Sequence, residues 1–146
     1  MSDNTVILEV KELHKSFDGH EVLKGISTTI KKGDVLALIG DLGTGKTALT
    51  RYIGEGLGIR QRISSPTFTI VKEYTDGRLP LYHFDVYRVT DPDALFEIGA
   101  DEYFYGDGVC VIEWADLIAD SLPENTKYIY LRYGETPEER IYQCTC

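Results

Sequence analysis

The stretch that decides the fold reads Val35-Leu36-Ala37-Leu38-Ile39-Gly40-Asp41-Leu42-Gly43-Thr44-Gly45-Lys46-Thr47. Residues 35–39 are apolar throughout, which is typical of a strand covered on both faces of a sheet. Residues 40–47 match the pattern G-x-x-x-x-G-K-[ST] in full, and residues 47–58 carry apolar side chains at helical spacing. A strand, a glycine-rich turn and a helix in this order predict a phosphate-binding loop.

In such a loop the glycines let the backbone curl, so that successive amides and the helix N-terminus point at phosphate oxygens. We expect the Lys46 ammonium to reach the β- and γ-phosphates and the Thr47 hydroxyl to ligate Mg²⁺. The predicted cofactors are therefore ATP and Mg²⁺. The residues expected to contact the nucleotide here are Asp41, Leu42, Gly43, Thr44, Gly45, Lys46, Thr47 and Ala48. The loop does not decide the reaction, because kinases, GTPases, ATPases and motors share it.

The remaining pattern alternates strand-like and helix-like segments without a linker or an internal repeat. Residues 6–17 and 22–30 flank the turn Asp18-Gly19, which predicts an N-terminal antiparallel β-hairpin. Further strands are expected over residues 68–74, 81–87, 109–112, 127–133 and 140–145, with a capped helix start at 91–96 and a helix over 114–122. The predicted fold is a single α/β domain over residues 1–146, like that of P-loop NTPases, with a mixed central sheet flanked by helices.

The segment Ser64-Ser65-Pro66-Thr67 places hydroxyl groups on a rigid loop before a strand. Such a loop is able to act as a nucleotide-sensing switch, with Thr67 presenting its oxygen to Mg²⁺ or to the γ-phosphate. The alternative is a proline-fixed turn that only leads into the strand.

Two further segments place acids where apolar strands end. In His83-Phe84-Asp85-Val86-Tyr87-Arg88, alternation puts the first, third and fifth side chains on one face, and Asp85 is placed to hold metal-bound water. In Val111-Ile112-Glu113-Trp114, Glu113 is placed to hold Mg²⁺ or orient water, and Trp114 to shield it. The alternatives are an Asp85–Arg88 surface pair beside a core tyrosine, and a helix-capping Glu113 beside a core tryptophan.

The composition limits the partners. The 146 residues include 15 basic and 24 acidic side chains, for a net charge of −9. An acidic chain repels phosphate backbones at long range, so we expect no nucleic acid binding by this protein alone. The chain carries neither a membrane-spanning apolar run nor a signal-like start, and its three cysteines have no disulfide spacing, which predicts a cytoplasmic protein.

The phosphate loop and the three segments together resemble the TsaE (YjeE) family of bacterial ATPases, with Ile112-Glu113-Trp114-Ala115-Asp116 as the last motif. The likeness covers residues 33–146 in the family's motif order. It implies an ATPase, weak in isolation, that supports N6-threonylcarbamoylation of adenosine 37 in tRNA together with the proteins TsaD and TsaB. The resemblance also implies a role for each motif residue. Lys46 would bind phosphates, and Thr47 and Glu113 would ligate Mg²⁺. Thr67 would be the switch residue, and Asp85 the Walker-B-like acid.

The first segment has a different resemblance. Residues 6–32 look like the opening of an ABC-transporter ATPase, in which an aromatic residue at the position of Phe17 stacks on adenine and Val22 lies nearby. The resemblance implies a hybrid chain, ABC-like over residues 1–32 and TsaE-like over 33–146. The alternative function is a chimeric module that binds ATP without turnover, and a small-molecule kinase ranks third because nothing marks an acceptor pocket.

Overall fold

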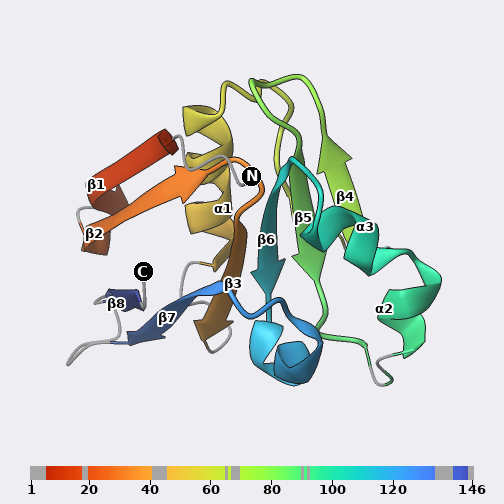
Figure 1. The fold of residues 1–146 in the computed structure, drawn as a ribbon. Coiled ribbons are helices and arrows are strands. Elements are labelled where there is room, and N and C mark those ends of the chain that lie inside the picture. The colour runs from red at the N-terminus through yellow and green to blue at the C-terminus, as the bar shows by residue number, and fades with distance from the viewer. Residues whose placement is uncertain are drawn as a thin grey trace.

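The computed structural model describes residues 6–17, 20–40, 46–64, 66, 70–89, 91, 93–133 and 140–144, with side chains described between residues 30 and 131. Two sheets form in this part of the chain (Figure 1). The strands are β1 (Val6–Phe17), β2 (His20–Lys31), β3 (Val35–Gly40), β4 (Val71–Tyr74), β5 (Leu81–Asp85), β6 (Val109–Glu113), β7 (Lys127–Tyr133) and β8 (Arg140–Cys144). The helices are α1 (Lys46–Gly56), α2 (Asp93–Glu97), α3 (Ala100–Phe104) and the 3₁₀-helix η1 (Ala115–Ser121).

The larger sheet has the strand order β4-β5-β6-β3-β7-β8. β3 lies between β6 and β7 and is parallel to both, and β5 is parallel to β6. The outer strands β4 and β8 each pair antiparallel with their neighbour. The predicted mixed sheet, and the predicted closing antiparallel pair, are confirmed.

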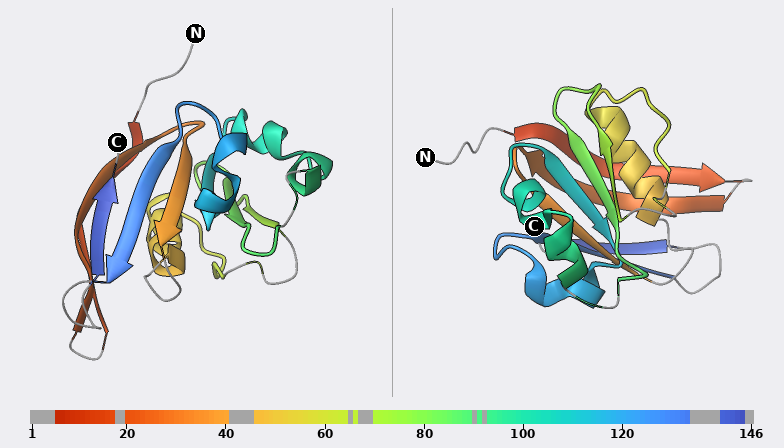
Figure 2. Two further views of the ribbon diagram at one scale, coloured as in Figure 1. Left: turned by 90° about the horizontal axis from the view of Figure 1, so that it is seen from below. Right: turned by 90° about the vertical axis from the view of Figure 1, so that its right-hand side faces the viewer.

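Alternation along the central strands divides the core into two layers. Leu36 and Leu38 face α1, while Val35 and Ala37 face the side that α2, α3 and η1 cover (Figure 2). The α1 layer is made by Ile30, Leu36, Leu38, Leu49, Ile53, Leu57, Ile59, Ile63, Tyr74, Leu81, Val109, Val111, Ile129 and Leu131. The opposite layer is made by Val35, Ala37, Phe84, Val86, Leu95, Ala100, Phe104, Cys110, Ile112, Ala115 and Ile118. A strand covered on both faces needs apolar residues at every position, which explains the continuous run at 35–39.

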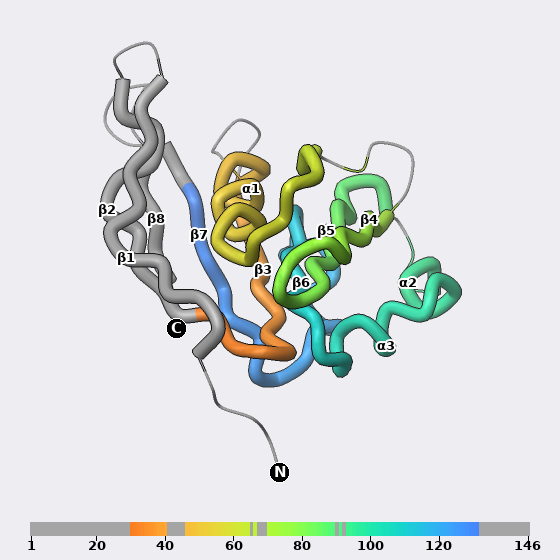
Figure 3. The backbone as a smooth tube through the Cα atoms, turned by 90° about the horizontal axis from the view of Figure 1, so that it is seen from above, coloured from red at the N-terminus to blue at the C-terminus, as the bar shows by residue number. Residues whose placement is uncertain are grey.

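The N-terminal hairpin forms as predicted, because β1 and β2 pair antiparallel. They make a separate two-stranded sheet, and β2 lies beside β8 at one end of the larger sheet. Figure 3 shows α1 on one face of the larger sheet and α2 and α3 on the other. Asp18 and Gly19, the predicted turn, lie outside the described residues.

The end of β5 and the type of the helix after β6 differ from the predictions, whereas the capped start of α2 agrees with them. β5 ends at Asp85 because the Asp85 carboxylate accepts the backbone N–H of Tyr87 at 3.0 Å and turns the chain. The predicted helix over 114–122 is a 3₁₀-helix from Ala115, interrupted by non-helical backbone at Ile118. α2 begins at Asp93, whose backbone N–H donates to the Asp91 carboxylate at 3.0 Å, as expected of a capped start.

None of the helices in the described ranges combines the length and apolarity needed to cross a bilayer.

Cys110 supplies the first prediction. It is 0 % exposed in β6, and burial raises the pKa of its thiol from 9.0 to about 12. Because the thiolate is the reactive form, we expect Cys110 to resist a thiol reagent at pH 8 in the native Cys144→Ser/Cys146→Ser protein and to react fully after unfolding. The raised pKa also means that this thiol's contribution to stability is full below pH 9 and declines as pH rises toward 12. Rapid native labelling in a colorimetric thiol assay would contradict this burial.

Candidate functional site

The candidate site lies where the carboxyl ends of β3, β5 and β6 meet the first turn of α1 (Figure 1). Glu113 ends β6, and its register partners are Leu38 on β3 and Asp85 on β5. Val109 and Val111 pack in the α1 layer, so the two-residue period of a strand turns Glu113 toward α1 as well. Leu81 on β5 also packs in the α1 layer, so His83 and Asp85, two and four residues later, face α1 as well.

Thr47 and Glu113 are in direct contact. The Thr47 hydroxyl donates to the Glu113 carboxylate, with Oγ1 at 3.0 Å from Oε1 and 3.1 Å from Oε2. Glu113 is 3 % exposed, and Thr47 is half-buried. The structure therefore joins a residue of the phosphate-loop motif to an acid 66 residues later, and these are the two predicted Mg²⁺ ligands.

His83 is a second neighbour of Glu113. Strand alternation predicted that His83 shares a face with Asp85, but it assigned no role to His83. His83 is fully buried, and its Nε2 hydrogen-bonds Glu113 Oε2. The other ring nitrogen, Nδ1, is buried without a hydrogen-bond partner among the described residues. The Glu113 carboxylate is therefore held from two elements: His83 on β5 contacts Oε2, and the Thr47 hydroxyl on α1 contacts both oxygens. The pattern that could have identified it is its two-residue spacing from Asp85, in a strand next to the one that ends in Glu113.

The Lys46 side chain is held at the site and is 5 % exposed. Its ammonium donates to the Gly40 carbonyl oxygen at 2.7 Å and lies 4.0 Å from the centroid of the Trp114 ring. A carbonyl oxygen and an aromatic face together stabilise a buried ammonium, although neither carries a full negative charge. An arriving phosphate group would give Lys46 a stronger partner than either.

Trp114 follows Glu113 with backbone in the left-handed region, at φ 63° and ψ 32°. This conformation is unfavourable for a bulky residue and is often found at functional sites. The ring is half-buried between Lys46 and Tyr87, whose ring centroid lies 4.8 Å away. Glu113 contacts Thr47 and His83 and does not cap η1, so the interpretation as a helix-capping acid is wrong.

Asp85 lies beside Glu113 at the end of β5 and is half-buried. Its backbone N–H donates to the Ile70 carbonyl oxygen at 2.9 Å, and Oδ1 accepts from the Tyr87 backbone. These contacts fix the strand end that carries the predicted Walker-B-like acid. Tyr87 is 60 % exposed, so the alternative of a core tyrosine next to Asp85 is wrong.

Several predicted site residues lie outside what the structure describes. These are Thr67 and the loop residues Asp41, Leu42, Gly43, Thr44 and Gly45. Phe17 and Val22 lie in β1 and β2, but their side chains are not described. Ala48 lies in the first turn of α1 and is half-buried.

The donor set fits a hard divalent cation bound together with a nucleotide. Thr47 and Glu113 offer oxygens, which Mg²⁺ prefers, and it commonly takes only one or two protein ligands beside phosphate and water. In the described part of the chain, no group of three or more His, Cys, Asp or Glu side chains is arranged to hold a metal by itself.

β3 and α1 flank the loop motif of residues 40–47, and the adjacent strands β5 and β6 each end in an acid; these features define an α/β protein of the P-loop type. The chain belongs to the TsaE family, described as threonylcarbamoyl adenosine biosynthesis protein TsaE, whose match covers residues 13–141.

Curated relatives and a solved structure agree with this family. The TsaE protein of Bacillus subtilis is 53% identical over 111 residues, which are 76% of this chain and 69% of the relative. The TsaE protein of Treponema pallidum is 48% identical over 107 residues, covering 73% and 78% of the two chains. The crystal structure of YdiB from Bacillus subtilis matches with a TM-score of 0.66 and 48% sequence identity, over 79% of this chain and 70% of that one.

The family match begins inside the segment that resembles an ABC-transporter ATPase. Residues 13–32 lie within the TsaE match, so the resemblance of residues 6–32 to ABC proteins, and the hybrid origin inferred from it, gain no support.

The contact between Lys46 and Trp114 gives an optical prediction. Trp114 is the chain's one tryptophan, so its emission reports on this ring alone. If ATP draws the Lys46 ammonium from the ring to its phosphates, titration with ATP will change the fluorescence in a saturable way. The Lys46→Met variant should start from a different emission and show no such change. An identical titration curve for the two proteins would contradict the assigned contact.

Proposed function

We propose that this protein is an ATP hydrolase of the P-loop type that requires Mg²⁺ and supports N6-threonylcarbamoylation of adenosine 37 in tRNA, acting with TsaD and TsaB. The observation that carries the ATPase part is the Thr47–Glu113 contact, because it joins the metal-binding hydroxyl of a phosphate loop to a buried carboxylate. Membership of the TsaE family supports the pathway and the partners.

Each side chain of the site then has a role. Lys46 and the amides of residues 41–48 bind the phosphates, and Trp114 borders the nucleotide next to Lys46. Thr47 and Glu113 hold the Mg²⁺ ion, which supplies positive charge against the charge developing on the transferred phosphoryl group. Asp85, at the neighbouring strand end, orients the attacking water.

Further assignments rest on the sequence and on the resemblances that it carries. Thr67 acts as the residue that senses the γ-phosphate, and adenine packs against Phe17 beside Val22 on the hairpin. Residues 1–146 act as one cytoplasmic ATPase domain whose turnover is weak until its partners bind. TsaD and TsaB hold the tRNA, because this chain's net charge of −9 opposes direct RNA binding.

Substitution separates binding from hydrolysis. Lys46→Ala removes the cation that contacts phosphates, so we expect ATP affinity to fall by about tenfold or more and phosphate release to stop. Glu113→Gln keeps the shape but removes the charge that faces Mg²⁺, and turnover should fall about 100-fold with less effect on binding. Phe17→Ala should weaken ATP, but not inorganic triphosphate, if adenine stacks there.

The matched control is Glu124→Gln, which changes an exposed acid in the turn between η1 and β7. Calorimetry measures binding, and a coupled phosphate-release assay measures turnover. Phosphate release that neither Lys46→Ala nor Glu113→Gln alters would reject the assigned site. Tight ATP binding with no release in the unmodified protein, even with its partners added, would favour a module that binds without turnover.

The pathway is tested in cells. We expect the chain to restore growth and threonylcarbamoyladenosine content to a bacterium that lacks its own TsaE ATPase, with tRNA nucleosides measured by mass spectrometry. The Lys46→Ala chain, expressed to the same level, should restore neither. Failure of the unmodified chain despite expression and ATP binding in the lysate would contradict the pathway assignment and leave the ATPase assignment intact.

A further inference from the structure

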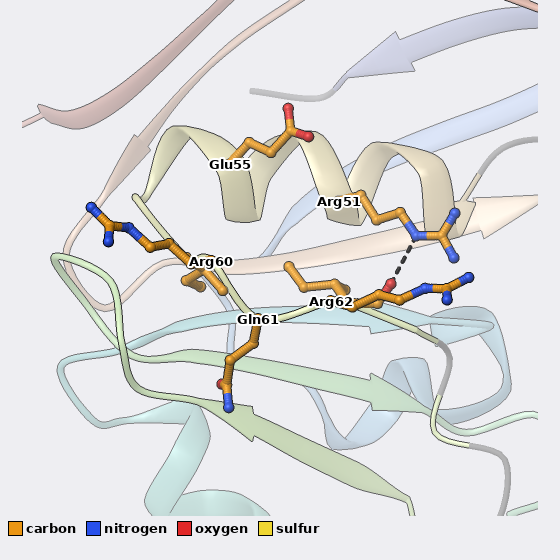
Figure 4. Close-up of a pocket in the computed structure, with 7 residues that line it drawn as sticks. Arg51, Glu55, Arg60, Gln61 and Arg62 are labelled. Atoms are coloured by element: carbon orange, nitrogen blue, oxygen red, sulfur yellow. Dashed lines mark hydrogen bonds between the residues drawn. The ribbon is translucent and has the colours of Figure 1, made fainter.

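A second basic site lies away from Glu113, between the exposed side of α1 and the segment that follows it. A pocket of about 350 Å³ is lined by Arg51, Glu55, Ile59, Arg60, Gln61, Arg62 and Ile63 (Figure 4). The lining contains three arginines and one glutamate, although the whole chain carries nine more acidic than basic side chains. Positive charge is therefore concentrated locally, against the overall balance.

Hydrogen bonds of the main chain hold the segment that carries most of the pocket's lining residues in place. Ile59 N donates to the Gly54 carbonyl oxygen at 3.0 Å, and the Asp76 carboxylate accepts the N–H groups of Arg60 at 2.8 Å and Gln61 at 3.3 Å. Ile63 is buried against α1 where Gly54 has no side chain, because a Cβ at that position would lie 2.1 Å from Ile63 Cδ1. The basic side chains therefore extend from a fixed segment.

Within the part of the chain that the structure describes, the three guanidinium groups have no acidic partner. Arg51 Nε donates to the Ile63 carbonyl oxygen at 2.8 Å, which orients this side chain while its two terminal nitrogens stay available. Figure 4 shows Arg62 extending in the same direction as Arg51, and Arg60 extending from the opposite end of the segment. No carboxylate within the described ranges forms an ion pair with any of these three residues.

We propose that this pocket binds a small anion that carries phosphate groups, such as pyrophosphate or the phosphates of a nucleotide. Arg51 and Arg62, which extend in the same direction, can donate several N–H groups from planar guanidinium groups to phosphate oxygens, whereas Arg60 extends the other way and adds positive charge at the far end of the lining. A volume of about 350 Å³ falls in the range of small-molecule sites. The net charge of −9 disfavours a long RNA strand, whose phosphates extend beyond the pocket, whereas a small anion fits within it, where salt screens distant charges and the nearby guanidinium groups dominate.

The test separates this pocket from the phosphate loop. Metal-free pyrophosphate, and separately ADP, is titrated by calorimetry into the Lys46→Ala protein, so that heat from the loop is removed. We expect the remaining binding to weaken about tenfold when Arg60→Gln/Arg62→Gln is added, two side chains for which the described residues show no hydrogen bond. Glu55→Gln, which removes the one negative charge of the lining, should tighten binding.

Lys32→Gln is the matched control for the single variant Arg62→Gln, because it also removes one positive charge but lies outside the pocket. We expect Lys32→Gln to change the affinity less than twofold. The anion that binds more tightly identifies the source of the phosphate. Affinities that Arg60→Gln/Arg62→Gln leaves unchanged would overturn the proposal, and so would tighter binding of a labelled oligoribonucleotide or a poly-glutamate peptide than of either small anion. Heat lost only on Lys46→Ala belongs to the phosphate loop and decides the proposed function separately.

Discussion

The arrangement of the site depends on one buried carboxylate. Glu113 is almost fully removed from water, and a carboxylate in that position is unfavourable unless hydrogen bonds replace its hydration. Thr47 supplies a hydroxyl from α1, and His83 supplies a ring nitrogen from β5. Three elements are thereby fixed around one charge, and the phosphate-loop helix is set against the strand ends that carry the acids.

Lys46 is positioned by the same geometry. With Glu113 bound by Thr47 and His83, the ammonium is placed on the Gly40 carbonyl oxygen and the Trp114 ring. Trp114 reaches that place through left-handed backbone directly after β6, which costs on the order of 1–3 kcal/mol and requires surrounding packing to maintain it. Tyr87 provides part of that packing from the turn after β5. The ends of β5 and β6 are therefore joined in two ways: Asp85 and Glu113 are register partners, and the rings of Tyr87 and Trp114 pack together.

Much of this could be predicted from patterns of local residue types. The apolar run at 35–39, the loop motif and the period of the following helix predicted β3 and α1, and strand alternation placed His83 and Asp85 on one face. The His83–Glu113 bond was not predictable, because the register of β5 against β6 is a long-range property. The 3₁₀ geometry of η1 was missed for a related reason, since the conformation of Trp114 is imposed by tertiary packing and opposes its intrinsic preference.

The central place of β3 in the sheet sets an order of events during synthesis. β3 and α1 leave the ribosome early, but both parallel neighbours of β3 come from much later in the chain. Until residue 113 has emerged, a nascent chain holds its phosphate loop without the acid that Thr47 requires. The proposed nucleotide site is therefore incomplete until that point, so nucleotide binding would stabilise the chain only after the long-range parallel pairing has formed.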